Sequence, residues 1–373
     1  MTIKIKGMED LFKEVIEPGL CTICGACVGD CPYLTFYRGR IRMTDFCNRT
    51  EGHCYEYCPR TPSDLDELSR TVFGTSYSGD EIGFHRNIVM AQATNKTIKS
   101  KAQYGGTITA LLSFALKKGI IQSALVEYTD DNKLPKGMQA ISSQDLLKST
   151  GSNYMAYPAL EALNHITKDS KEKLGIVLTP CQCLALAKMR TYPSARRIEM
   201  NNIGIVLGLF CTWALDHGRF YDFLKEKTDV PKIRKFDIPP PPANRFDIYY
   251  DKKIQSFSLD EVRNSRMPTC AYCIDMTAEF ADISVGAVES IEGWNTVIIR
   301  SKRGALLFDQ AKKQGIIETD SLPPEILEHL KESSMFKKSR GLKECIKYTG
   351  DRDNLFYLKM DDKIKNKLLA FPG

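Results

Sequence analysis

The pattern of apolar and polar positions divides the chain into two parts of different character. Residues 8–16 have the spacing of a short amphipathic helix, and the cysteine-rich stretch that follows to about residue 62 holds no long apolar run. From about residue 87, short apolar runs alternate with stretches of helical periodicity. The pattern predicts strands over 87–92, 122–128, 175–178, 203–209, 281–286 and 295–300, and helices over 107–116, 158–166, 180–190 and 304–314. The predicted fold class is therefore α+β or α/β.

Length, charge and cysteine content narrow the class of protein. The chain has 373 residues and a formal net charge of +6, which suits an anionic ligand without indicating nucleic acid. We expect no transmembrane segment, because no run approaches the ~18 apolar residues of a membrane span. Thirteen cysteines without an apolar leader at the start predict a reducing, cytoplasmic setting and metal chemistry.

The first cysteine motif carries the strongest chemical signal. Cys21, Cys24, Cys27 and Cys31 form C-x2-C-x2-C-x3-C-P, which is the run that binds 4Fe–4S clusters in bacterial ferredoxins. Glycine at 25 and 29 leaves the loop free to wrap a cluster.

A second motif follows, with Cys47, Cys54 and Cys58 spaced C-x6-C-x3-C-P. In a two-cluster ferredoxin the pairing is crossed, so Cys58 is expected to complete the Cys21, Cys24 and Cys27 set. Cys31 then joins Cys47 and Cys54, which leaves the second cluster one thiolate short. His53 or Asp45 is a candidate for the missing ligand, or the cluster has lost one iron. A pair of zinc sites is the alternative interpretation.

A third set of cysteines lies in the α/β part. Cys181 and Cys211 follow two apolar strands, at the strand ends where α/β sheets place their ligands. Cys270 and Cys273 form a C-x-x-C pair that would complete four ligands for a further 4Fe–4S cluster. Cys183 competes with Cys181 for the first position, and we favour Cys181.

The pair Gly105 and Gly106 opens the helix predicted at 107–116. Bare amides at a helix start, with Thr107 and Thr109 beside them, could bind a phosphate. Simple chain reversal is the alternative, and it is the commoner reason for glycine at this position.

These motifs, in this order, resemble the beta-subunit family of coenzyme F420-dependent hydrogenases and dehydrogenases. The resemblance runs from Cys21 to about Glu318 and includes the segments 103–106, 151–154, 179–182, 208–211, 270–273, 281–286 and 293–294. It implies FAD, 4Fe–4S clusters (two N-terminal and one in the flavin domain) and the deazaflavin coenzyme F420 as substrate. It also implies a larger partner: a hydrogenase, a formate or carbon monoxide dehydrogenase, or a membrane oxidoreductase.

The resemblance and the local patterns together give the residues expected to bind cofactor. They are Lys101, Gln103, Gly105, Gly106, Thr107, Thr109, Ser152, Asn153, Tyr154, Thr179, Asp282, Ser284 and Gly286. Small residues at 284 and 286 would let a flat ring approach the backbone. Because the tail of F420 is anionic, Lys101 and Arg300 are expected at its entrance.

Three regions are predicted: a ferredoxin-like 4Fe–4S module over 1–63, a mixed α/β domain for FAD, F420 and a further cluster over 64–322, and a basic extension over 323–373. The polar stretch 63–85, loop-like apart from a short helix around 64–68, is expected to separate the first two regions. The extension is expected to be a solvated helix or a docking tail. The predicted function is electron transfer between the clusters and F420 through FAD. The alternatives are an electron-relay subunit without an F420 site and a zinc-bound adaptor.

Overall fold

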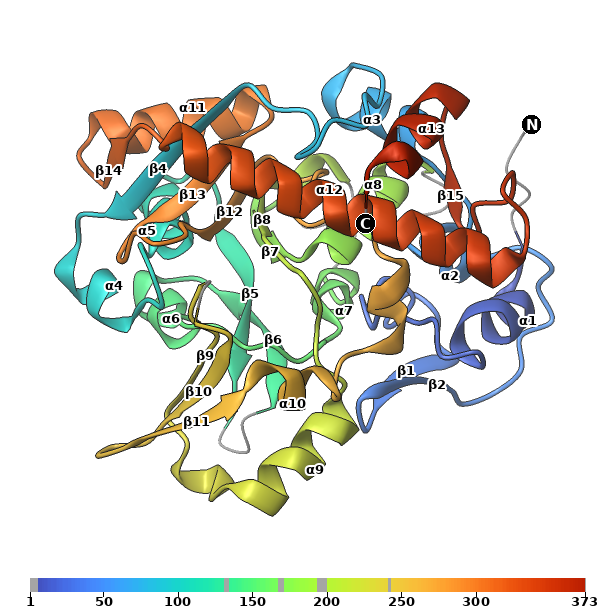
Figure 1. The fold of residues 1–373 in the computed structure, drawn as a ribbon, viewed down its shortest axis with the longest axis horizontal. Coiled ribbons are helices and arrows are strands. Elements are labelled where there is room, and N and C mark those ends of the chain that lie inside the picture. The colour runs from blue at the N-terminus through green and yellow to red at the C-terminus, as the bar shows by residue number, and fades with distance from the viewer. Residues whose placement is uncertain (1–5, 131–133, 167–170, 193–199, 241–242, 373) are drawn as a thin grey trace.

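The computed structural model describes residues 6–130, 134–166, 171–192, 200–240 and 243–372. Its centre is an eight-stranded sheet with the order β14-β4-β13-β12-β8-β7-β5-β6 (Figure 1). The strands are β4 (Asn87–Ala93), β5 (Ser123–Thr129), β6 (Pro135–Ala140), β7 (Leu174–Leu178), β8 (Ile203–Leu209), β12 (Ile283–Ala287), β13 (Asn295–Ile299) and β14 (Ile317–Asp320). The adjacent strands β5, β7, β8 and β12 are parallel, and β6, β13, β4 and β14 join antiparallel. The α/β prediction is confirmed for this part.

Helices cover both faces of the sheet because its central strands are apolar on both sides. On β8, Val206 belongs to one core and its neighbour Leu207 to the other. The helices are α4 (Lys96–Lys101), α5 (Thr107–Lys117), α6 (Ser143–Lys148), α7 (Ala159–Asn164), α8 (Pro180–Thr191) and α11 (Lys302–Lys313). Residues of α5 and α11 pack into the Leu207 core, whereas α7 and α8 pack into the Val206 core. The predicted strands and helices of this part are therefore present.

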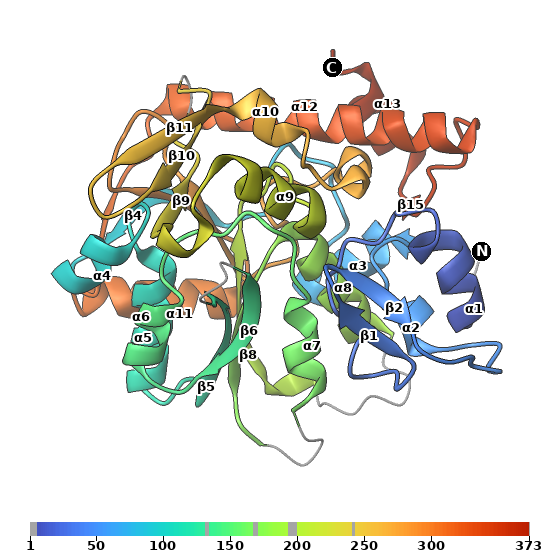
Figure 2. The same ribbon diagram turned by 90° about the horizontal axis from the view of Figure 1, so that it is seen from below.

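A smaller three-stranded sheet lies beside the central one, with the order β11-β10-β9 (Figures 1 and 2). Its elements are α9 (His217–Lys227), β9 (Lys235–Asp237), β10 (Arg245–Tyr249), β11 (Ile254–Ser258) and α10 (Leu259–Arg263). Short 3-10 turns over Met200–Asn202, Val230–Lys232 and Pro268–Tyr272 connect the surrounding segments. An aromatic core of Phe220, Phe236 and Phe246 holds α9 against this sheet.

The N-terminal region is mostly loop, with little regular structure of its own. It holds α1 (Met8–Leu11), a π-helical turn (Phe12–Ile16), a hairpin of β1 (Leu34–Tyr37) and β2 (Arg40–Met43), α2 (His53–Glu56), β3 (Ser63–Asp64) and α3 (Leu65–Phe73). The helix predicted over 8–16 is present with a π-helical second half. The helix expected around 64–68 is present as α3 and is longer than expected, and it buries Leu65 and Leu68 in the Val206 core.

The C-terminal residues are part of the fold rather than a solvated extension. The 26-residue helix α12 (Pro324–Thr349) crosses the molecule from the β14 side to the N-terminal region, as both ribbon views show (Figures 1 and 2). It buries Leu342 and Cys345, and Lys338 forms a buried ion pair with Glu279. Beyond it, β15 (Leu358–Lys359) pairs with β3, and α13 (Asp362–Ala370) ends the described chain.

Several contacts tie residues 6–63 to the rest of the chain, so they do not form a detached module. Lys188 donates hydrogen bonds to the carbonyls of Cys58 and Pro62. The side chain of Asn164 donates to the carbonyls of Gly25, Ala26 and Val28. The first cysteine loop is therefore held in shape by a helix of the sheet domain.

Candidate functional site

A cavity of about 1170 Å³ opens at the carboxyl ends of the parallel strands. Its wall includes Val126 and Glu127 of β5, Val177 of β7 and Leu209 of β8. The small sheet and α12 contribute further residues, among them Phe236 and Phe336. Parallel α/β sheets bind their ligands at this edge, and the volume is ample for a flavin-sized group.

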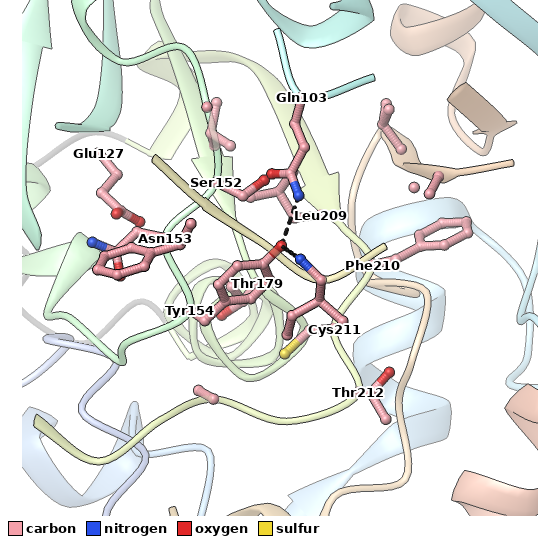
Figure 3. Close-up of a pocket in the computed structure, with 18 of the residues that line it drawn as sticks. Gln103, Glu127, Ser152, Asn153, Tyr154, Thr179, Leu209, Phe210, Cys211 and Thr212 are labelled. Carbon is pink, nitrogen blue, oxygen red and sulfur yellow. Dashed lines mark hydrogen bonds between the residues drawn. The ribbon is translucent and has the colours of Figure 1, made fainter. Parts of the chain in front are cut away.

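Most residues expected to bind cofactor line this cavity. The set consists of Lys101, Gln103, Gly106, Thr107, Thr109, Ser152, Asn153, Tyr154, Thr179 and Gly286. Figure 3 shows Gln103, Ser152, Asn153, Tyr154 and Thr179 gathered around one space with Leu209, Phe210 and Cys211. The fold thus brings together segments that lie more than 100 residues apart in the sequence.

Four of the expected residues do not line the cavity. Gly105 packs against β4 and β13, since a Cβ there would lie 2.8 Å from the carbonyl oxygen of Ala91. The carboxylate of Asp282 is 1% exposed, pairs with Arg303 at 2.7 Å and accepts from the Val206 amide. Asp282 therefore joins α11 to β8.

Ser284 and Arg300 also have buried partners within the fold and lie away from the cavity. Arg300 is fully buried and donates to the Ser284 hydroxyl and to the carbonyls of Ile82, Phe84 and Thr277. The expected place of Arg300 at a ligand entrance is therefore wrong, because every direction of its guanidinium faces protein. The sequence could not separate this buried cation from a surface one.

Contacts with neighbouring residues already occupy part of the start of α5. Gly106 has φ +70°, and a Cβ there would meet Ile98 at 2.8 Å rather than the cavity. The amide and hydroxyl of Thr107 are held by Asn295 Oδ1. Thr109 follows on the cavity side, and its hydroxyl has no hydrogen-bond partner among the described residues. The phosphate-binding capacity of this helix start therefore rests on the amides around Thr109.

A polar network around Gln103 in the cavity wall includes an acceptor without a partner. The side-chain amide of Gln103 donates to the Tyr154 hydroxyl at 2.7 Å and also to Asp237, while Tyr154 accepts from the Ile238 amide at 2.9 Å (Figure 3). Gln103 Oε1 is buried with no partner among the described residues. A bound group with an N–H or O–H donor would satisfy it, which fits a flavin or deazaflavin ring.

Glu127 is a cavity residue that the sequence reading missed. Its carboxyl, at the end of β5, points into the space beside Asn153 (Figure 3). Burial raises its pKa well above the ordinary value for glutamate. A single acidic residue within the apolar run Leu125-Val126-Glu127-Tyr128 was the available signal.

Cys181, Cys211, Cys270 and Cys273 all line the same cavity. Burial raises the pKa of the Cys211 thiol, Lys337 opposes this, and the Cys270, Cys181 and Cys273 thiols raise it again, so the four lie within electrostatic reach of each other. The Cys270 sulfur accepts from the Ala214 amide at 3.4 Å. Cys183 is buried, its sulfur directed to the Leu178 carbonyl at 3.9 Å, and it is not part of the lining.

The thiols of the N-terminal cysteines influence one another within and between the two expected groups. Burial raises the pKa of Cys24 well above the ordinary value, and the Cys58 and Cys21 thiols raise it further. Burial also raises the pKa of Cys27, and the thiols of Cys24, Cys21, Cys58 and Cys54 add to it. Burial raises the pKa of Cys54 to about 12, with contributions from Cys31, Cys47 and Cys58. The crossed grouping of Cys58 with Cys21, Cys24 and Cys27 therefore stays a prediction.

The two candidates for the missing ligand have other partners. His53 Nδ1 lies 3.2 Å from Asp30, whose carboxylate raises the pKa of the imidazole, and the ring stacks on Tyr57. Asp45 is exposed and accepts from the Phe46 amide. Within the described ranges, no three His, Cys, Asp or Glu side chains are arranged to hold a single metal ion.

Buried cations accompany the cysteine groups. Lys188 is 1% exposed, and its ammonium donates to the Cys58 carbonyl at 2.7 Å; burial lowers its pKa to about 7. Lys337 is 3% exposed and donates to the Cys211 carbonyl at 2.6 Å. Arg60 donates to Thr269, whose hydroxyl donates to the Leu20 carbonyl, and its charge opposes the rise in pKa of the Cys21 and Cys181 thiols. None of these three has an ion-pair partner within the described residues, although buried cations normally need a nearby anion.

Among the residues that the structure describes, no helix is long and apolar enough to cross a membrane.

Comparison with known proteins identifies the family to which the chain belongs. Residues 88–164 match the family described as coenzyme F420 hydrogenase/dehydrogenase, beta subunit N-term, and residues 171–325 match its C terminus. The coenzyme F420 hydrogenase subunit beta of Methanothermobacter thermautotrophicus is 33% identical over 64% of this chain and 85% of its own length. The coenzyme F420-dependent sulfite reductase of Methanocaldococcus jannaschii is 30% identical over 82% of this chain, which spans only 48% of that protein.

A solved structure is also similar. A chain of the F420-reducing [NiFe] hydrogenase complex from Methanosarcina barkeri superposes with a TM-score of 0.66 at 28% identity, covering 72% of this chain and 94% of that one. The N-terminal and C-terminal family matches and the 33% identical relative point to the same family. The chain belongs to the coenzyme F420 hydrogenase/dehydrogenase beta-subunit family.

Proposed function

We propose that this chain transfers electrons between 4Fe–4S clusters and coenzyme F420, with FAD exchanging hydride with F420 in the cavity. The observation that most supports this is the shared wall: the Cys181 group and the residues from Gln103 to Tyr154 line one space. Clusters carry single electrons and a deazaflavin takes a hydride, so a flavin between them supplies the conversion. The three cysteine groups extend from this cavity into the N-terminal region.

The chain's own residues would hold these groups as follows. The amides around Thr109 at the start of α5 suit the FAD phosphates, and Ser152, Asn153 and Tyr154 supply polar contacts on the neighbouring loop. Gln103 Oε1 offers the acceptor for a ring N–H. Lys101 and Arg340 line the cavity and are exposed, which suits the anionic tail of F420 in place of the buried Arg300.

The iron would be held by the three cysteine groups: Cys21, Cys24, Cys27 and Cys58; Cys31, Cys47 and Cys54; and Cys181, Cys211, Cys270 and Cys273. We further propose that the chain works in the cytoplasm as a subunit of a larger oxidoreductase. Related proteins are named as subunits of an F420 hydrogenase, an F420H2 dehydrogenase and an F420-dependent formate dehydrogenase.

The test is anaerobic purification of the full chain, followed by analysis of metal and flavin and by reaction with F420H2. We expect one FAD and about eleven to twelve irons per chain, since three clusters of about four irons are proposed and one lacks a thiolate. Adding F420H2 should bleach the flavin spectrum. Iron and flavin without this bleaching would support an electron-relay subunit, and zinc without flavin would support the adaptor alternative.

A further inference from the structure

We propose that Arg60 is a shared positive charge between the Cys21 and Cys181 groups, which raises the reduction potentials of the clusters at both sites together. This inference rests on the proposed function, because it concerns clusters that these thiolates would hold. Arg60 lines the cavity, and its proposed effect on the clusters is through its charge, so in this role it is a positioning residue for electron transfer.

The first support is the place of Arg60 in the chain's hydrogen bonding. Its guanidinium donates from Nε to the Thr269 hydroxyl and from Nη2 to the Thr269 carbonyl, both at 2.9 Å. The Thr269 hydroxyl in turn donates to the Leu20 carbonyl at 2.5 Å. Leu20 precedes Cys21, Thr269 precedes Cys270, and Arg60 itself follows Cys58 by two residues. One side chain therefore links the loops of two cysteine groups.

The second support is its burial without a carboxylate. Arg60 is 3% exposed, stacks over the Tyr357 ring at 4.5 Å, and has no ion-pair partner in the described ranges. A guanidinium removed from water is unfavourable unless an anion lies nearby. The titratable groups that act on Arg60 are the Tyr357 phenol and the thiols of Cys273, Cys181 and Cys345. Arg60 in turn opposes the rise in pKa of the Cys21 and Cys58 thiols in one group and of the Cys181 thiol in the other.

The third support is a contrast with the other two buried cations. The Lys188 ammonium bonds to carbonyls next to Cys58, and the Lys337 ammonium to the Cys211 carbonyl, so each faces one group. Of these three cations, only Arg60 has contacts or electrostatic influence at two cysteine groups. Reduction adds one electron to a cluster, and a fixed neighbouring cation favours that more negative state. Because arginine stays protonated, Arg60 favours reduction at both sites.

The experiment is a potentiometric titration of the whole iron-loaded protein, with the clusters followed by electron paramagnetic resonance. Arg60→Gln keeps hydrogen-bond donors but removes the charge. We expect it to lower the reduction equilibrium constants of two clusters at least tenfold, which is 59 mV for one electron. Arg60→Lys keeps the charge and should stay within threefold of wild type. The exposed Arg70→Gln is the matched control and should change nothing.

The possible outcomes decide between the proposals. Unchanged potentials in an iron-replete Arg60→Gln protein would overturn the inference, as would a shift confined to one cluster. If Arg60→Gln loses iron, Thr269→Asp replaces it, because a carboxylate against the guanidinium should produce the same paired decrease. A wild-type protein without reducible clusters would instead overturn the proposed function, whatever the variants do.

Discussion

The N-terminal region and the sheet domain bring their cysteines together by different means. Six of the seven N-terminal cysteines lie close to another in the sequence, and loops with little regular structure carry them. In the sheet domain, Cys181 begins α8, Cys211 follows β8, and Cys270 and Cys273 sit at the turn Pro268–Tyr272. Short spacing in the sequence therefore brings the N-terminal cysteines together, whereas the order of the strands brings the cysteines of the Cys181 group together.

The two regions also differ in what supports them. The sheet domain has large apolar cores on both faces. The N-terminal region has a smaller apolar cluster, which includes Met8, Leu11 and Ile23. Its cysteine loops also receive hydrogen bonds from other elements, such as those of Asn164 and Lys188. Small iron–sulfur regions usually gain stability from their metal, so we expect the N-terminal region to be the more sensitive to cluster loss.

The largest expected effect is the loss of a whole cluster from the sheet domain. Cys211→Ser should lower the iron content by about four per chain and leave the N-terminal clusters in place, since the fold around β8 does not depend on that thiol. Elemental analysis with electron paramagnetic resonance measures this. Cys183→Ser is the matched control and should keep all iron. Loss of iron from Cys183→Ser with retention in Cys211→Ser would reverse the assignment.

The crossed grouping gives an equally large effect in the N-terminal region. If Cys58 completes the Cys21 group, Cys58→Ser should remove or distort that cluster while Cys31→Ser spares it. Mössbauer or paramagnetic resonance spectra of the two variants distinguish the clusters. A Cys31→Ser protein that loses the Cys21 cluster would support four local ligands instead.

A smaller effect concerns α12, which joins the two regions. Lys338→Met would leave Glu279 buried without its cation, and breaking such a pair costs about 3–5 kcal/mol of unfolding free energy. Denaturant unfolding of the cluster-loaded chain measures this. The exposed Lys347→Met on the same helix should change stability by less than about 0.5 kcal/mol. Equal values for both variants would show that α12 is not anchored by the buried pair.

The smallest expected effect is on flavin binding. Thr109→Asp sets a negative charge where phosphate is expected, although acids at a helix start usually stabilise the helix. We expect about a tenfold loss of FAD affinity, near 1.4 kcal/mol, without loss of iron. Thr109→Ser keeps the hydroxyl and should bind normally. Full flavin content in the aspartate variant would move the phosphates elsewhere. Gly106→Val is a poorer test, because its Cβ would collide with Ile98 and its φ is +70°.

Much of this organisation could be predicted from the sequence. The apolar runs gave the positions of the main strands, and cysteine spacing with the motifs of the α/β part gave three groups of thiols and most of the cavity wall. Tertiary contacts could not be predicted in the same way. Arg300 and Asp282 look like ligand-binding residues until their buried partners are known. The basic residues of α12 suggest a solvated tail, yet burial of Lys337 and Lys338 depends on thiols and a carboxylate far away in the sequence.

The sequence also could not show how firmly the N-terminal region is attached to the sheet domain. A polar stretch at 63–85 suggests a linker, but the leucines of α3 pack into the main core and β3 pairs with β15 from the far end of the chain. A truncation near residue 80 would therefore expose apolar surface in the sheet domain. Single cysteine substitutions test the electron route more cleanly.

The central claim is that the clusters and FAD share electrons with F420 through one cavity, and counting electrons tests it most directly. The full chain is reduced anaerobically with dithionite, freed of reductant and titrated with excess F420 while the deazaflavin absorbance is followed. Two electrons on FAD and one on each of three clusters make about five, so about two F420 per chain should be reduced. About one per chain would mean that the clusters do not feed the flavin, and no reduction would contradict the F420 site itself.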